Sequence, residues 1–195
     1  EYASGERDSV SKWYSDVKDF SLWLTAPGKA PVKLATKAGV DFYSATFIPA
    51  DKGHYILTVV HEAKELGGTT KYEFSSNAVV NVGASTMAVE SSAIKNPLYV
   101  TLEQVKAHSL NQPVKVKALI NGQPLIKKAV TVFSPEGWGK EFMTDENGMF
   151  SFQPIWAGRY VIEASNYEKK DGEHHGVSYD AVWQGATTSF EIAKR

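Results

Sequence analysis

The sequence predicts an all-β protein made of two tandem β-sandwich domains. Apolar and polar residues alternate with a period of two along most of the 195 residues, and long helical patterns are lacking. Turn signals recur about every 10 to 14 residues, a spacing typical of sandwiches. Small and polar residues at 84–97 form a linker. We therefore expect a first domain at 1–92 and a second at 93–195.

The composition places the chain among globular proteins. Hydrophobic residues make up 43% and charged residues 22% of the sequence, unlike in a disordered chain. The formal net charge is −1, so no overall attraction to nucleic acid or to an anionic membrane is expected. The absence of cysteine excludes disulfides, thiolate metal sites and a cysteine nucleophile. No run reaches the roughly 18 consecutive apolar residues of a membrane helix.

The first domain contains six strand-like segments. Turn signals with Gly or Pro, such as APGKAP and PADKG, separate them. The segments span residues 19–26, 31–36, 40–49, 54–62, 71–76 and 78–83. After the last of them, a short helix is expected around residues 88–94.

The second domain contains eight further strand-like segments. In the second of them, Val114, Val116 and Ala118 alternate with two lysines, which predicts one buried and one exposed face. Asn121-Gly122 predicts a tight hairpin, because both central residues of a type I′ turn need positive φ. The segments span residues 98–102, 113–120, 129–134, 140–144, 149–154, 159–165, 178–183 and 187–193.

An acidic run, Asp145-Glu146-Asn147-Gly148, raises the question of a calcium site. It lacks both the alternating Asp spacing and the twelfth-position Glu of a calcium loop. Asp and Asn are also common turn formers, and Gly148 can adopt positive φ. We therefore expect a hairpin between segments 140–144 and 149–154.

The second domain resembles a known family of sandwiches. NGQPL, AVTV, TDENGMFSF and AGRYVIEA follow one another in residues 121–164. This order resembles the repeating pattern of transthyretin-like and carboxypeptidase-regulatory-like domains. The resemblance implies that Tyr160, Ile162 and Ala164 line the core.

The whole chain resembles bacterial extracytoplasmic proteins grouped with the periplasmic component of nickel/cobalt uptake systems. The similar motifs are FSLWLTAPG, YSATFIPADKGHY and the tail SYDAVWQGATTSFEI. The resemblance implies an immunoglobulin-like first domain, export to the periplasm or cell surface, a nickel or cobalt ion, and a membrane metal transporter or cell-surface partner. The family's histidine-bearing N-terminal segment is missing before Glu1, so we expect a first domain without one or two strands.

Histidines are the candidate metal ligands, because imidazole binds nickel, cobalt and zinc. His174 and His175 adjoin Glu173 in EKKDGEHHGVSYD. Neighbouring strand residues point to opposite faces, so both imidazoles reach one metal only if the chain turns there. An exposed polar hairpin loop is the alternative. His61 is expected to be structural, and His108 to be a solvated loop residue.

Tryptophans are the candidate contacts for an organic ligand. Trp138, in PEGWGKE, and Trp156, in PIWAG, fall in expected loops beside one strand pair. If both were exposed they would form a binding patch for a protein or a glycan. Trp23 and Trp183 lie within alternating segments and are expected in the core.

Catalytic motifs are not recognisable in the sequence. The segment at His61 departs from His-Glu-x-x-His at its second histidine, and no serine lies in Gly-x-Ser-x-Gly. Paired carboxylates remain an open alternative, because their separation in space decides their role. We therefore expect a non-enzymatic extracytoplasmic binding or accessory protein linked to metal uptake. A structural or adhesive module is the alternative.

Overall fold

The computed structural model describes residues 3–4, 16–40, 42–83, 97–104 and 106–193. Strands dominate this part of the chain, which confirms the all-β prediction, and the one helix described there is a single 3₁₀ turn. The elements are β1 (Ala3–Ser4), η2 (Val17–Asp19), β2 (Ser21–Thr25), β3 (Val32–Leu34), β4 (Lys37–Ala38), β5 (Tyr43–Ser44), β6 (Gly53–Glu62), β7 (Thr70–Val82), β8 (Leu98–Leu102), β9 (Val114–Ile120), β10 (Gln123–Pro124), β11 (Ala129–Phe133), β12 (Trp138–Met143), β13 (Met149–Phe152), β14 (Gly158–His174) and β15 (Val177–Ile192).

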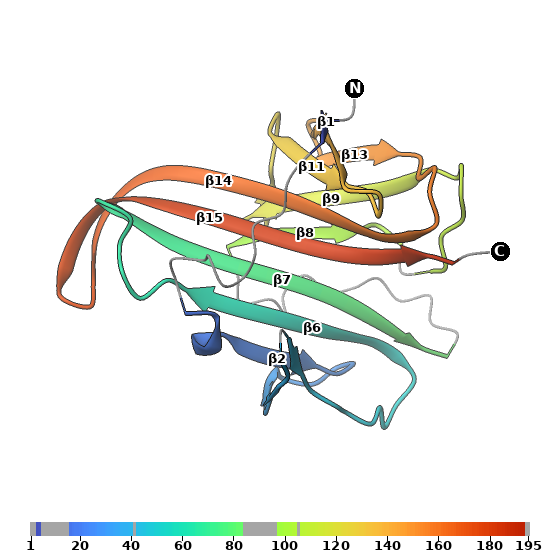
Figure 1. Ribbon diagram of the computed structural model, residues 1–195, viewed down its shortest axis with the longest axis horizontal. Helices are drawn as coiled ribbons and strands as arrows, with labels where there is room; N and C mark the ends of the chain where they lie inside the picture. Colours follow the sequence, from blue (N-terminus) through green and yellow to red (C-terminus); the bar gives the residue numbers. More distant parts are fainter. Residues whose placement is uncertain (1–2, 5–15, 41, 84–96, 105, 194–195) are drawn as a thin grey trace.

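A nine-stranded sheet runs through both halves of the chain. Its order is β1-β12-β11-β14-β15-β7-β6-β2-β3, and Figure 1 shows β14 and β15 lying beside β7 and β6. The junction is a parallel pairing of β7 with β15, from Thr70 opposite Ala181 to Asn77 opposite Thr188. Hydrogen bonds thus cross the expected domain boundary, and the two tandem sandwiches remain a prediction.

A second sheet covers one face of β11, β14 and β15. It has the order β10-β9-β13, with β8 paired to β9. Val114, Val116 and Ala118 point into the layer between the sheets and are at most 1% exposed, as their alternation predicts. Tyr160, Ile162 and Ala164 of β14 meet them from the other side, which agrees with the residue pattern of the resemblance.

Several strands are longer than the sequence predicts. Segments 71–76 and 78–83 form the single strand β7, and segments 178–183 and 187–193 form the single strand β15. These strands form hydrogen bonds with neighbouring strands on both sides, and this pairing continues across their polar residues. In contrast, only β5 forms within 42–49 of the segment expected at 40–49. The helix expected at 88–94 lies outside the described residues.

Two predicted turns contain the expected backbone. Asn121 (φ 51°) and Gly122 (φ 77°) join β9 to β10 as a hairpin, which confirms that prediction. Gly148 (φ 70°) also turns, and Asp145 Oδ1 accepts hydrogen bonds from Asn147 N at 2.8 Å and Met149 N at 2.9 Å. The hairpin prediction for this acidic run is nevertheless wrong. Because β12 pairs with β11 and β13 pairs with β9, the turn carries the chain from one sheet to the other.

Replacing Gly148 should destabilise the fold far more than replacing Gly122. A Cβ at Gly148 would meet the carbonyl oxygen of Ala118 at 2.5 Å and Leu125 N at 2.9 Å, whereas a Cβ at Gly122 meets nothing within 4 Å. Gly148→Ala therefore adds a clash with backbone to the strain of positive φ, and we expect a loss of about 2 to 4 kcal/mol. Gly122→Ala carries the strain alone, about 1 kcal/mol. Urea unfolding compares the two variants, and equal midpoints would contradict the prediction.

Candidate functional site

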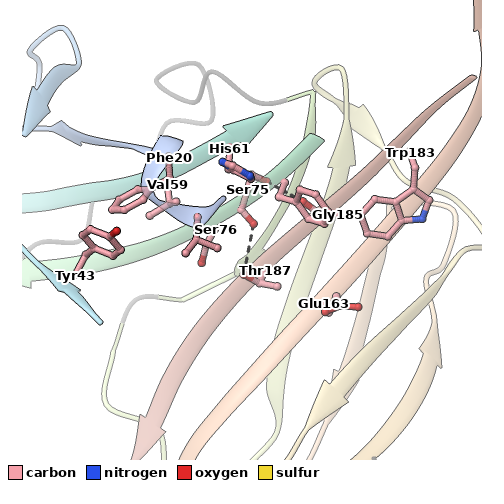
Figure 2. Close-up of a pocket in the computed structure, with 12 residues that line it drawn as sticks. Phe20, Tyr43, Val59, His61, Ser75, Ser76, Glu163, Trp183, Gly185 and Thr187 are labelled. Atoms are coloured by element: carbon pink, nitrogen blue, oxygen red, sulfur yellow. Dashed lines mark hydrogen bonds between the residues drawn. The ribbon is translucent and has the colours of Figure 1, made fainter. Parts of the chain in front are cut away.

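A cavity of about 460 Å³ opens on the face of the nine-stranded sheet that the second sheet does not cover. Strands β6, β7, β15 and β14 form its floor, and Val17 of η2, Phe20 directly after it and Tyr43 of β5 close one side. Figure 2 shows Phe20 and Tyr43 on that side, Trp183 and Glu163 on the other, and Ser76 and Thr187 between them. We call this cavity the aromatic groove.

The floor of the aromatic groove is one row of cross-strand neighbours. Glu163 lies opposite Thr187, Thr187 opposite Ser76, and Ser76 opposite Val59. The two central side chains are short, so the sheet surface stays low between larger neighbours. The row therefore offers a carboxylate, two hydroxyls and an apolar end across four strands.

Gly185 determines the position of the Trp183 ring, which forms one wall of the aromatic groove. A Cβ at this position would meet Cη2 of Trp183 at 2.6 Å, so the indole ring occupies the space above the glycine. In that position the Trp183 ring packs against Phe74, with ring centroids 5.4 Å apart, and against Tyr72 at 5.7 Å. These separations are those of favourable aromatic pairs.

The opposite wall comes from the first strands of the chain. Phe20 and Tyr43 meet edge to face with centroids 4.9 Å apart. Asp16 caps the preceding 3₁₀ turn, because its Oδ1 accepts a hydrogen bond from Lys18 N at 3.0 Å. This N-cap defines where η2 begins, and Phe20 follows directly after its last residue. Val17 adds an apolar side chain to the same wall.

Desolvation shifts the pKa of two ionisable groups of the aromatic groove. His61 is only 5% exposed, and this desolvation lowers its pKa from the usual 6.5, against the opposing charges of Asp19 and Asp16. Glu163 is exposed at the rim, yet desolvation by its neighbours raises its pKa from the usual 4.5. At neutral pH the imidazole is therefore uncharged, and Glu163 holds its proton more tightly than a free carboxylate does.

The predicted metal ligands lie at the tip of the β14–β15 hairpin. His175 (φ 50°) and Gly176 (φ 80°) form the turn, and the His174 and His175 rings approach with centroids 4.3 Å apart. His174 Nε2 donates a hydrogen bond to the carbonyl of Ala63 at 2.9 Å, and Glu173 points to the other face of the strand. Among the residues that the structure describes, no three His, Asp or Glu side chains gather as a metal site.

The predicted loop tryptophans lie near the start of β14. Trp138 begins β12 and is 41% exposed, whereas Trp156 is half-buried. Tyr160 binds the backbone of Trp156 twice: its hydroxyl accepts from Trp156 N at 3.0 Å and donates to Trp156 O at 3.1 Å. Only one of the two indoles is thus well exposed, and a binding patch formed by both remains a prediction.

Two other expectations are wrong in an informative way. Trp183 was expected in the core, but it is half-buried and forms a wall of the aromatic groove. His108 was expected to be solvated, but it packs on Phe190 with centroids 5.2 Å apart, and burial lowers its pKa. The alternation of apolar and polar residues shows from which face of a strand a side chain points. Only the pairing of that strand with other strands shows what the face packs against.

The comparison with protein-family models shows which family the chain belongs to. The model of a domain of unknown function, DUF4198, covers residues 14–168. The chain belongs to this family. The matched residues include η2 and every groove residue up to Glu163, while Trp183, Gly185 and Thr187 lie beyond the match. None of the curated proteins matches the chain. No helix among the described residues is long and apolar enough to cross a membrane.

Glu163 should make the stability of the protein fall as the pH rises. Because its pKa is raised on folding, its contribution is fully present below a pH of about 4.5 and is lost as the pH rises through the folded-state pKa. Glu163→Gln stays neutral, so this variant should gain stability relative to wild type over that range. Urea unfolding between about pH 4 and about pH 8 measures the difference, in which the titration of His61 cancels.

The matched control for this test is Glu141→Gln, a change of an exposed carboxylate on β12. Its stability difference from wild type should not rise with pH in the same way. If the free energy of unfolding changed with pH in the same way for wild type and Glu163→Gln, the groove would not desolvate this carboxylate and the prediction would be contradicted.

Proposed function

We propose that the protein is a non-enzymatic binding protein whose aromatic groove takes a small organic molecule with an apolar body. The observation that carries the proposal is the aromatic groove itself. Its volume of about 460 Å³ lies within the range of about 300 to 1,000 Å³ that is usual for ligand pockets. Aromatic walls with a few polar groups are the usual lining of such sites.

Packing supports a groove that exists before the ligand arrives. The Trp183 ring is held against Phe74 and Tyr72, and Phe20 is held against Tyr43. Side chains that are already ordered lose little entropy on binding, so more of the burial energy contributes to affinity. The hydroxyl groups of Ser76 and Thr187 lie between the walls and can orient a polar substituent of the ligand.

The wider setting of this proposal comes from the resemblance of the sequence. We place the protein outside the cytoplasm, in the periplasm or at the cell surface, as an accessory of nickel or cobalt uptake. Its partner would be a membrane metal transporter or a cell-surface protein. The division into an immunoglobulin-like and a transthyretin-like sandwich belongs to the same proposal.

Transition-metal capture at the tip of the β14–β15 hairpin is the second candidate function. The approach of the His174 and His175 rings favours it. His174 Nε2 is engaged by Ala63, which leaves Nδ1 of that ring for a metal. Tight metal sites usually contain more protein ligands than the two imidazoles of this hairpin tip. The geometry therefore fits transient binding of a metal ion better than its storage.

Trp183→Ala should weaken the binding of a neutral apolar dye. N-phenyl-1-naphthylamine is a suitable probe, because its fluorescence rises when it leaves water for an apolar site. Loss of the indole removes one wall, and we expect the dissociation constant to rise about tenfold or more. Trp138→Ala is the matched control, since this indole lies outside the aromatic groove.

A second variant separates binding from folding. Ser76→Leu adds bulk to the floor and should also exclude the dye, while urea unfolding reports whether each variant is folded. Wild-type affinity in folded Trp183→Ala and Ser76→Leu would rule the aromatic groove out. Loss in Trp138→Ala alone would favour the adhesive alternative, with Trp138 and Trp156 as the contact.

Nickel titration tests the second candidate. Calorimetry should show weak binding to the wild type and none to His175→Ala, which removes one imidazole at the turn. His108→Ala is the control, since its ring packs on Phe190, away from the hairpin tip. No heat with the wild-type chain, or full binding by His175→Ala, would contradict a site at His174 and His175.

A further inference from the structure

We propose that the aromatic groove selects organic cations, meaning molecules that carry an ammonium group on an apolar body. This inference rests on the proposed function and names the chemical class of its ligand. Three observations carry it: the aromatic rings that line both sides, a carboxylate at the end of the floor, and the charges of the remaining lining.

Aromatic rings are the first observation. Phe20 and Tyr43 stand on one side of the aromatic groove and Trp183 on the other, where its ring packs against Phe74. The face of an aromatic ring carries partial negative charge, so rings around one space attract a cation, and the attraction grows when water is displaced. Quaternary ammonium groups are bound by aromatic cages of this kind.

Glu163 is the second observation. It lies on the same side of the aromatic groove as Trp183 and in register with Thr187 (Figure 2). Among the described residues, no Lys, Arg or His forms an ion pair with its carboxylate. Desolvation by its neighbours is the one cause of its raised pKa, so no neighbouring positive charge offsets that desolvation. A bound cation would supply the missing counter-charge.

The remaining charges of the site point the same way. The described lining contains no Lys or Arg, and His61 is uncharged at neutral pH. Beside the groove, η2 contributes Asp19, together with Asp16, which pairs with Lys18. The described lining residues of β5, β7 and β15 carry no charge at neutral pH, and those of β14 contribute only Glu163. An anionic ligand would therefore lose its hydration without gaining a positively charged partner.

Three probes that share a benzyl body test the inference. They are benzyltrimethylammonium, its neutral isostere neopentylbenzene, and the anion phenylmethanesulfonate. Displacement of N-phenyl-1-naphthylamine measures each affinity. We expect the cation to bind about tenfold or more tightly than the neutral isostere, and the anion to bind most weakly. In Glu163→Gln the ratio of cation to neutral affinity should fall about tenfold, and in Glu141→Gln it should stay as in wild type.

The wild-type protein provides a second readout that needs no variant. Lowering the pH protonates Glu163 and His61, and both changes disfavour a cation, so the affinity for benzyltrimethylammonium should fall while that for neopentylbenzene holds. Equal or tighter binding of neopentylbenzene at neutral pH would overturn the cation inference and leave the proposed function standing. If the neutral dye also failed to bind, both would be overturned.

Discussion

The parallel pairing of β7 with β15 is the contact on which the rest of the structure depends. It joins a strand of the first half of the chain to the last strand of the second half, over eight residue pairs. Asn77 reinforces it, because its side-chain amide donates to the carbonyl of Thr187 on β15 at 3.4 Å. The same amide also donates to the carbonyl of Val100 in the second sheet at 2.8 Å. Without this ladder, Ser76 would not lie beside Thr187, and the floor of the aromatic groove would be two separate edges.

The alternation of apolar and polar residues predicted where most strands form and which face of a strand is buried. It predicted little about which strands pair with one another. Val114, Val116 and Ala118 could be assigned to a buried face, because residues of one strand carry that information. The pairing of β7 with β15 could not be predicted, since about 110 residues separate Ser75 from Gly185 and no local pattern names the partner. The acidic turn at Asp145 shows the same limit. Its backbone geometry was predictable, but the sheet to which it delivers the next strand was not.

The site was harder to predict than the fold for a related reason. Glu163, Ser76 and Thr187 are ordinary outward-facing strand residues in the sequence, and only their adjacency across three strands makes them a floor. Trp183 lies in an alternating segment, which is equally typical of a core and of a wall. In contrast, the histidine pair attracted attention because its members are neighbours in the chain. Local motifs therefore indicated the hairpin tip, while the aromatic groove lies on the face of the sheet.

Gly185 has a consequence for how this chain can change. The space that its missing side chain leaves is filled by the ring of Trp183, so the two positions are coupled by volume. A larger residue at position 185 requires the indole to move or to be replaced, and either change alters the wall of the aromatic groove. Trp183 and Gly185 thus act as one unit, and a substitution at either position has to be interpreted together with the other.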